Sequence, residues 1–135
     1  MERQKKIIDA SIIIKWFANE NDSDKAIILR DKHINEEISL VAPELVFLET
    51  VNGLKYKKLE QNILEKANKD LWNIQLEIFY LDEFLINKAI SASAEYNLSI
   101  YDSIYVALAQ IYGTQLITAD EKLLKTPNAI ALNKF

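Results

Sequence analysis

The sequence predicts an α/β fold with a mainly parallel sheet, and three observations support this prediction. Short runs rich in β-branched residues alternate with longer stretches of helical periodicity, which is typical of parallel strands joined by helices. Only two Gly and two Pro residues interrupt the pattern. The chain has 135 residues, 50% of them hydrophobic, which suits one compact domain. We therefore expect residues 1–135 to form a single domain.

The first elements follow from apolar residues and turn signals. Residues 7–8 predict a strand, and the turn after it leads into a helix that reaches Phe17. Ser23 and Asp24 can cap the next helix, in which Ile34 is expected to face inward.

The third expected helix carries an acidic residue on its apolar face. The helix follows a strand over residues 38–42, and Pro43 fits its first turn, where the missing N–H costs nothing. Helical spacing places five residues on one stripe: Leu45, Leu48, Glu49, Asn52 and Tyr56. We therefore expect Glu49 and Asn52 to point with the apolar side chains.

The remaining elements continue the alternation. Ser99 is expected to cap one of the helices, and Gly113 to end it as a C-terminal cap. In chain order, we expect a helix through 63–72, a strand over 76–81, a helix through 84–92, a helix over 99–113, and strands over 116–118 and 129–132.

Acidic residues interrupt segments that are otherwise apolar. A carboxylate that leaves water costs several kcal/mol unless it is paired or bound to a cation, and no buried Lys or Arg is an obvious partner. Oxygen ligands in a chain with no Cys and one His favour Mg²⁺ or Mn²⁺ over zinc or copper. The residues that we expect to bind such a metal are Asp9, Glu49, Asp102 and Asp120.

The positions of these acids are compatible with one site, although three of them also have a structural explanation. Asp9 and Asp120 follow strand ends, where open parallel sheets place their sites. Asp102 begins a helix, three positions after Ser99, as a capping box requires. Asp9 can instead form an Asx-turn, and Asp120 can cap a short helix. Capping gives no reason for Glu49 to lie on an apolar stripe, although a tilt toward solvent could explain its place there.

Charge and the N-terminal composition limit the classes of function. The 16 basic and 20 acidic residues give a net charge of -4, which excludes a strongly basic nucleic-acid-binding domain. The four acids account for this excess, since 16 residues of each sign remain without them, and net charge therefore does not exclude a nucleic-acid substrate. The apolar stretch near the N-terminus is too short for a signal peptide or a membrane span. We expect a cytoplasmic protein with no membrane segment.

The four acids belong to four short segments: IIDAS (7–11), PELVFLETVN (43–52), YDSIYVALA (101–109) and LITAD (116–120). In this order and approximate spacing the segments resemble the motif blocks of PIN-domain ribonucleases, and the resemblance covers nearly the whole chain. The small size of the chain makes it most similar to the VapC-type toxins of toxin–antitoxin pairs.

The resemblance implies a Mg²⁺- or Mn²⁺-dependent endonuclease that hydrolyses RNA phosphodiester bonds. It implies a three-layer α/β/α arrangement around a five-stranded parallel sheet in the order 3-2-1-4-5. It also implies a small antitoxin partner, which would place an Arg or Lys among the carboxylates, and a homodimer. The family's acids carry over onto Asp9, Glu49, Asp102 and Asp120, with supporting polar residues at Ser11, Asn52 and Thr118.

A catalytically silent PIN-like module that binds RNA or serves as a protein scaffold is the alternative, but the intact acids argue against it. The lysines of segment 55–58 either hold an RNA backbone or form a solvated helix end. His33 lies in a charged stretch, which predicts a surface role. Trp16 and Phe17 are adjacent and cannot both face one core comfortably, so we expect the early helices to form the dimer contact.

Overall fold

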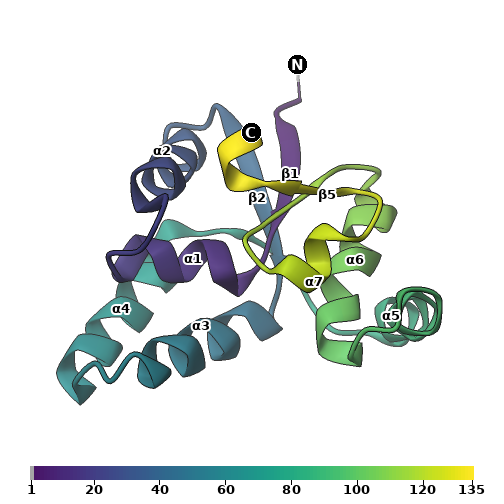
Figure 1. The fold of residues 1–135 in the computed structure, drawn as a ribbon. Helices are drawn as coiled ribbons and strands as arrows, with labels where there is room; N and C mark the ends of the chain where they lie inside the picture. Colours follow the sequence, from purple (N-terminus) through teal and green to yellow (C-terminus); the bar gives the residue numbers. More distant parts are fainter. Residues whose placement is uncertain (1) are drawn as a thin grey trace.

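A five-stranded parallel sheet forms the centre of the computed structural model, which describes residues 2–135 (Figure 1). The strands are β1 (Gln4–Ile8), β2 (Ile38–Pro43), β3 (Glu77–Phe79), β4 (Leu116–Thr118) and β5 (Ala129–Ala131). Their order is β3-β2-β1-β4-β5. The α/β class and the predicted strand order are thereby confirmed.

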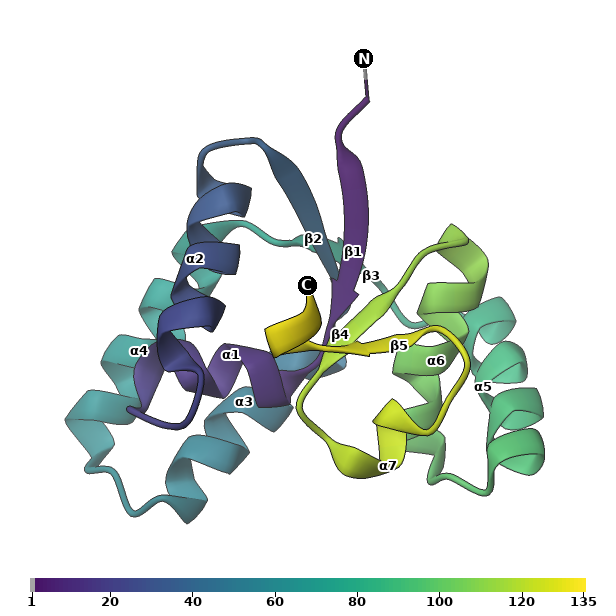
Figure 2. The same cartoon turned by 45° about the horizontal axis from the view of Figure 1, so that its top comes forward.

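Helices cover both faces of the sheet. They are α1 (Ala10–Phe17), α2 (Ser23–Ile34), α3 (Leu45–Tyr56), α4 (Gln61–Ile74), α5 (Glu83–Tyr96), α6 (Ile100–Tyr112), α7 (Glu121–Leu124) and the 3-10 turn η1 (Leu132–Lys134). In Figure 1 and again in Figure 2, α1 to α4 lie on one side of the sheet and α5 and α6 on the other. Among residues 2–135, no helix is both long and apolar enough to cross a membrane.

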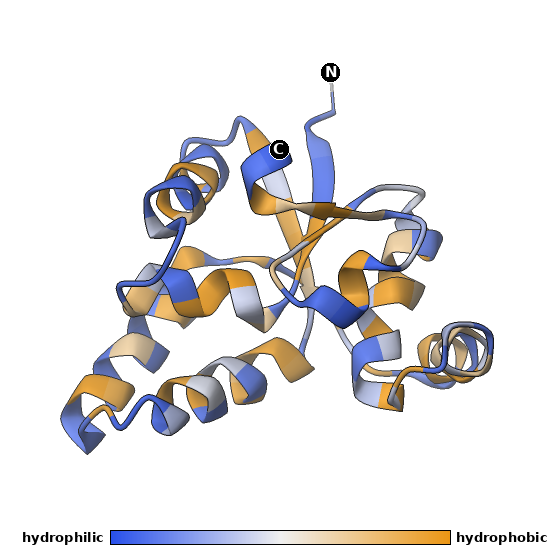
Figure 3. Ribbon diagram, viewed as in Figure 1, coloured by the Kyte–Doolittle hydropathy of each residue, from blue (hydrophilic) through white to orange (hydrophobic). Residues whose placement is uncertain are grey.

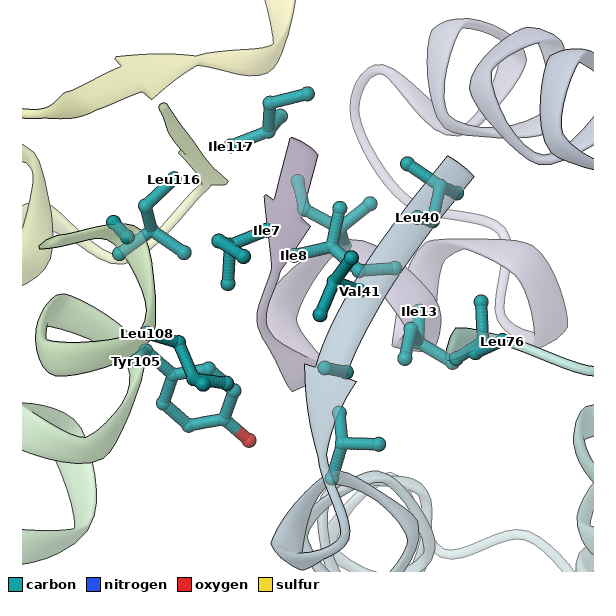
Figure 4. Packing of buried hydrophobic residues seen from close by; sticks show 14 of the residues in the cluster. Ile7, Ile8, Ile13, Leu40, Val41, Leu76, Tyr105, Leu108, Leu116 and Ile117 are labelled. Carbon is teal, nitrogen blue, oxygen red and sulfur yellow. The ribbon is translucent and has the colours of Figure 1, made fainter. Parts of the chain in front are cut away.

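The core lies along the central strands. Figure 3 shows hydrophobic residues on these strands and on the inner sides of the helices. β2 is buried along its whole length, and Ile7, Ile8, Leu116 and Ile117 are at most 1% exposed. Figure 4 shows how these side chains pack with residues from α1 and α6. Each fully buried aliphatic side chain stabilises the fold by about 1.5–3 kcal/mol.

The strand order also creates a crevice between β1 and β4. The chain moves from β1 toward β2 and from β4 toward β5, so the direction of winding reverses between β1 and β4. Open α/β sheets bind ligands outside the carboxyl ends of the strands at such a point. The register pairs Ile8 with Ile117, and this pairing brings Asp9 beside Thr118.

The predicted stripe on α3 is wrong. Pro43 ends β2, where it pairs with Phe79, and the helix begins only at Leu45. Leu48 and Tyr56 are 74% and 81% exposed. The helix instead buries Val46, Thr50 and Leu54. Packing against α1 and α4 turns this neighbouring stripe inward, and Glu49 lies half-buried at its edge.

Two predictions for the α2 region are wrong. Ile34 is 52% exposed rather than inward. α2 is preceded by Asp22 in a left-handed conformation without a side-chain cap, and the Ser23 hydroxyl accepts from the Glu20 N–H (2.9 Å) in the preceding loop. Trp16 is buried and donates its indole N–H to the Ala26 carbonyl (2.8 Å).

Phe17 is partly buried and packs against the same core as Trp16. The two rings meet edge to face with centroids 6.5 Å apart. Both side chains therefore fit within one chain, and their adjacency gives no reason for a dimer contact at α1.

Candidate metal and active site

The four predicted acids line one cavity of about 250 Å³ at the carboxyl ends of β1 and β4. Asp9 directly follows β1, Glu49 lies on α3, Asp102 is in the first turn of α6, and Asp120 directly precedes α7. The wall contains no Lys or Arg side chain, and its other polar residues are Ser11, Asn52 and Tyr105. Cavities of about 700 and 530 Å³ lie elsewhere, and none of the four acids lines them.

Two hydroxyl groups hold the Asp9 carboxylate. Ser11 Oγ donates to Asp9 Oδ1 (2.6 Å) and Thr118 Oγ1 donates to Asp9 Oδ2 (2.8 Å). Each hydroxyl in turn accepts a backbone N–H, Ser11 from Ala119 (2.9 Å) and Thr118 from Asp120 (3.0 Å). The backbone after β4 thereby orients both hydroxyls, and these fix both oxygens of Asp9. Ser11 and Thr118, which we predicted as supporting residues, are thus the two side chains that bond Asp9.

Burial makes the Asp9 carboxylate unfavourable when it is ionised. Asp9 is 5% exposed, and burial raises its pKa from 3.8 to about 6, although the hydrogen bonds from Ser11 and Thr118 lower it. The Asx-turn alternative does not apply, because Asp9 makes no side-chain cap to α1. Within residues 2–135 the one buried basic side chain is Lys6, which donates to Gln115 Oε1 (2.8 Å). Asp9 therefore has no buried cation to compensate it.

The four carboxylates act on one another in a ring. Burial raises the pKa of Glu49 and of Asp102, and the charge of Asp102 raises that of Glu49 further. Asp120 acts in the same way on Asp102, whose pKa is lowered in turn by the charge of Lys122, and both Asp120 and Glu49 act on Asp9. Nevertheless, no three His, Cys, Asp or Glu side chains of residues 2–135 stand close enough together to form a ready metal site.

The alternative capping roles apply to part of the set. Asp120 Oδ1 accepts the Lys122 N–H (2.8 Å), so this residue caps α7 as well as lining the cavity. Ser99 caps α6 as predicted, because its hydroxyl accepts the Asp102 N–H (3.1 Å). Asn52 is exposed at the cavity wall, and its side chain makes no hydrogen bond within residues 2–135.

Sequence reasoning missed Tyr105 as a site residue. Its hydroxyl donates to Glu49 Oε1, and its ring is 2% exposed. The available signal was its spacing, since Tyr105 stands three residues after Asp102 on the same helix and therefore lies on the same helix face.

His33 does more than the surface role that was predicted for it. Its Nδ1 accepts the Leu40 N–H (3.0 Å), and Nε2 lies 3.1 Å from the Gln75 carbonyl oxygen. The ring therefore links α2 to β2 and to the end of α4, away from the acidic cavity.

Comparisons with known proteins place the chain in a family. The PIN domain family matches residues 6–129. Ribonuclease VapC3 of Pyrobaculum aerophilum is 28% identical over 126 residues, which cover 88% of this chain and 92% of that protein.

Two solved structures support the fold. PAE2754 from Pyrobaculum aerophilum superposes with a TM-score of 0.74 at 20% identity, over 97% of this chain and 85% of that one. A toxin–antitoxin complex from Klebsiella pneumoniae contains a chain with a TM-score of 0.70 at 18% identity, over 94% of this chain and 97% of that one. Because the family match spans nearly all of the sheet and every acid of the cavity, the chain belongs to the PIN domain family.

Proposed function

We propose that the protein is a Mg²⁺- or Mn²⁺-dependent endoribonuclease of the VapC type, the toxin of a toxin–antitoxin pair. The observation that carries the proposal is the cavity wall with four carboxylates and no basic side chain. The relative named Ribonuclease VapC3 supports the choice of RNA as substrate. The proposal treats residues 1–135 as one PIN domain that acts in the cytoplasm.

The residues of the cavity fit a hard divalent cation. All of the charged donors are carboxylate oxygens, which are the ligands that Mg²⁺ and Mn²⁺ prefer. Asp9 is buried without a cationic partner, and a bound cation would offset its desolvation. The residues that would hold the cation are Asp9, Glu49, Asp102 and Asp120. When bound, a divalent cation supplies Lewis acidity for the activation of water and positive charge for the phosphate oxygens.

The chain's own residues divide the remaining tasks. Asp9 is the central ligand, because Ser11 and Thr118 hold both of its oxygens in place. Asp102 and Asp120 complete the set from α6 and from the segment between β4 and α7. Glu49 either contributes through a water molecule or accepts the proton that the attacking water loses. In both roles Glu49 must point into the cavity, whose wall it lines, and its Oε1 accepts a hydrogen bond from the Tyr105 hydroxyl.

Incubation with a structured RNA pool tests the proposal. The purified protein is incubated with Mn²⁺ or with EDTA, and new RNA ends are sequenced. We expect internal cuts with Mn²⁺, none with EDTA, and none with Asp9→Asn, while Asp24→Asn, an exposed site on α2, retains activity. If inhibitor-free protein binds RNA or protein partners and cuts no RNA with Mn²⁺, the catalytically silent module is the better description. Equal cutting in EDTA would refute the metal mechanism.

The proposal includes an antitoxin and a homodimer. The matched chain from Klebsiella pneumoniae belongs to a toxin–antitoxin complex, and an Arg or Lys side chain is a natural occupant of an acidic cavity. We expect a small partner to inhibit cleavage in competition with Mn²⁺. A partner that binds tightly and leaves cleavage unchanged would contradict this mode of inhibition. Light scattering at micromolar concentration tests the dimer, and a monomeric mass would contradict it.

A further inference from the structure

Tyr105 joins two helices that approach the cavity from opposite sides of the sheet. It lies on α6, and its hydroxyl donates to Glu49 Oε1 on α3. α3 and α6 lie on opposite sides of the sheet in Figure 2. Among the side-chain hydrogen bonds of residues 2–135, this is the one that connects α3 with α6. This contact therefore ties the Glu49 carboxylate to the helix that carries Asp102.

The ring of Tyr105 is fixed by its surroundings. The residue is 2% exposed, and Figure 4 shows its ring extending from α6 beside Leu108, with the hydroxyl oxygen at the far end. It also forms part of the cavity wall. A rigid buried ring with one polar atom at the cavity can hold a partner side chain in a defined place.

Glu49 needs such a restraint. It is half-buried at the edge of the inward face of α3, and its carboxylate faces the charges of Asp102 and Asp9. A Glu side chain has several rotatable bonds, and repulsion by two carboxylates favours rotamers that turn outward to water. The donated hydrogen bond opposes this rotation and is of the stronger, charge-assisted kind.

We propose that Tyr105 is a positioning residue that holds Glu49 in the cavity for metal binding. Its hydroxyl occupies Oε1 of Glu49 and leaves Oε2 for the cation or for a water molecule beside it. This inference rests on the proposed function, because it assigns Tyr105 a task in the same site. A purely structural role, in which the ring only fills the core, would make the hydroxyl dispensable for metal binding.

A double-mutant cycle on Mn²⁺ affinity tests the inference. Mn²⁺ binding is measured by isothermal titration calorimetry for the wild type, Tyr105→Phe, Glu49→Gln and the double variant. Because loss of a group that orients a metal ligand typically weakens binding about 10- to 100-fold, we expect Tyr105→Phe to raise the Kd about 10-fold. In the Glu49→Gln background, the same substitution should change the Kd less than about twofold, since the restrained carboxylate is gone.

Tyr112→Phe is the matched control. Tyr112 lies on the same helix, and its hydroxyl donates to Glu77 Oε2 (3.2 Å), away from the cavity. This variant should bind Mn²⁺ with the wild-type Kd. Urea unfolding of all variants in EDTA verifies that each one folds, and Tyr105→Met, which also lacks a hydroxyl and adds no volume to the core, replaces Tyr105→Phe if the latter does not.

The outcomes separate this inference from the proposed function. If the wild type binds Mn²⁺ and Tyr105→Phe binds it with the same Kd, the inference is overturned and the proposed metal site stands. An equal loss of Mn²⁺ affinity on Tyr105→Phe in the wild-type and Glu49→Gln backgrounds also overturns it, because Tyr105 would then act independently of Glu49. If the wild type itself binds no Mn²⁺, the metal-dependent function fails, and the inference fails with it.

Discussion

Replacement of Asp9 by Asn should stabilise the metal-free protein at neutral pH and much less at acidic pH. Asp9 is 5% exposed and its pKa is raised from 3.8 to about 6. A folded-state pKa above the unfolded one means that stability falls as the pH rises from about 4 to about 6 and the buried carboxyl loses its proton. Asn remains neutral throughout this range, so Asp9→Asn should not show this loss.

The two pKa values give the magnitude. Proton linkage with these two pKa values lowers the free energy of unfolding of the wild type by about 1 kcal/mol at pH 4.5 and by about 3 kcal/mol at pH 7.5. Asn cannot accept from both Ser11 and Thr118, and the imperfect hydrogen bond costs about 1 kcal/mol. We therefore expect Asp9→Asn to be about 2 kcal/mol more stable than the wild type at pH 7.5 in EDTA, and about equally stable at pH 4.5.

Urea unfolding in EDTA, followed by tryptophan fluorescence, measures this difference at both pH values. Asp24→Asn is the control, because Asp24 is an exposed carboxylate in the first turn of α2. Its loss should change stability by no more than about 1 kcal/mol, with a destabilising sign. If Asp9→Asn is less stable than the wild type at pH 7.5, or if its advantage does not grow between pH 4.5 and pH 7.5, Asp9 is not a destabilised buried carboxylate.

Three further predictions concern α6. Asp102→Asn should raise the melting temperature in EDTA, because it removes repulsion from Asp120. Mn²⁺ should raise the melting temperature of the wild type more than that of the variant, and equal shifts would exclude Asp102 as a metal ligand. Ser103→Ala should stabilise the protein by about 1 kcal/mol in urea unfolding, because the buried Ser103 hydroxyl has no hydrogen-bond partner among residues 2–135. A clear loss of stability would reveal a partner. Gly113→Ala should cost about 1 kcal/mol in the same assay, because Gly113 has a φ of +59° at the end of α6; a variant as stable as the wild type would refute this account of the cap.

The sequence by itself determined the features that depend on a few neighbouring residues. The strand Leu116–Thr118, the Ser99 cap and the Gly113 cap are confirmed at the predicted positions. Each results from local chemistry. The strand follows from a short β-branched run, the Ser99 cap from a hydroxyl three residues before an N–H, and the Gly113 cap from a residue that tolerates positive φ. The same local reasoning singled out Asp9 as a candidate metal ligand, because an acid directly after an apolar strand is unusual.

Tertiary packing decided the orientation of α3. Its sequence offers two apolar stripes, one through Leu48 and Tyr56 and one through Val46 and Leu54, and only the second is buried. A Cβ atom at Gly53 would meet the Ile14 side chain of α1, so the helices approach closely at that point. Which stripe is buried therefore depends on contacts with α1 and α4. The sequence of α3 alone contains no information about these contacts.

Tertiary structure also decided the fine geometry of the cavity. Tyr105 meets Glu49 across 56 positions of sequence, and Thr118 meets Asp9 across 109. Such pairs form because the register between β1 and β4 and the placement of α3 and α6 bring distant segments together. The sequence specified which residues carry charge, whereas their burial and mutual distances, and therefore their pKa values, come from contacts between elements that are far apart in the chain.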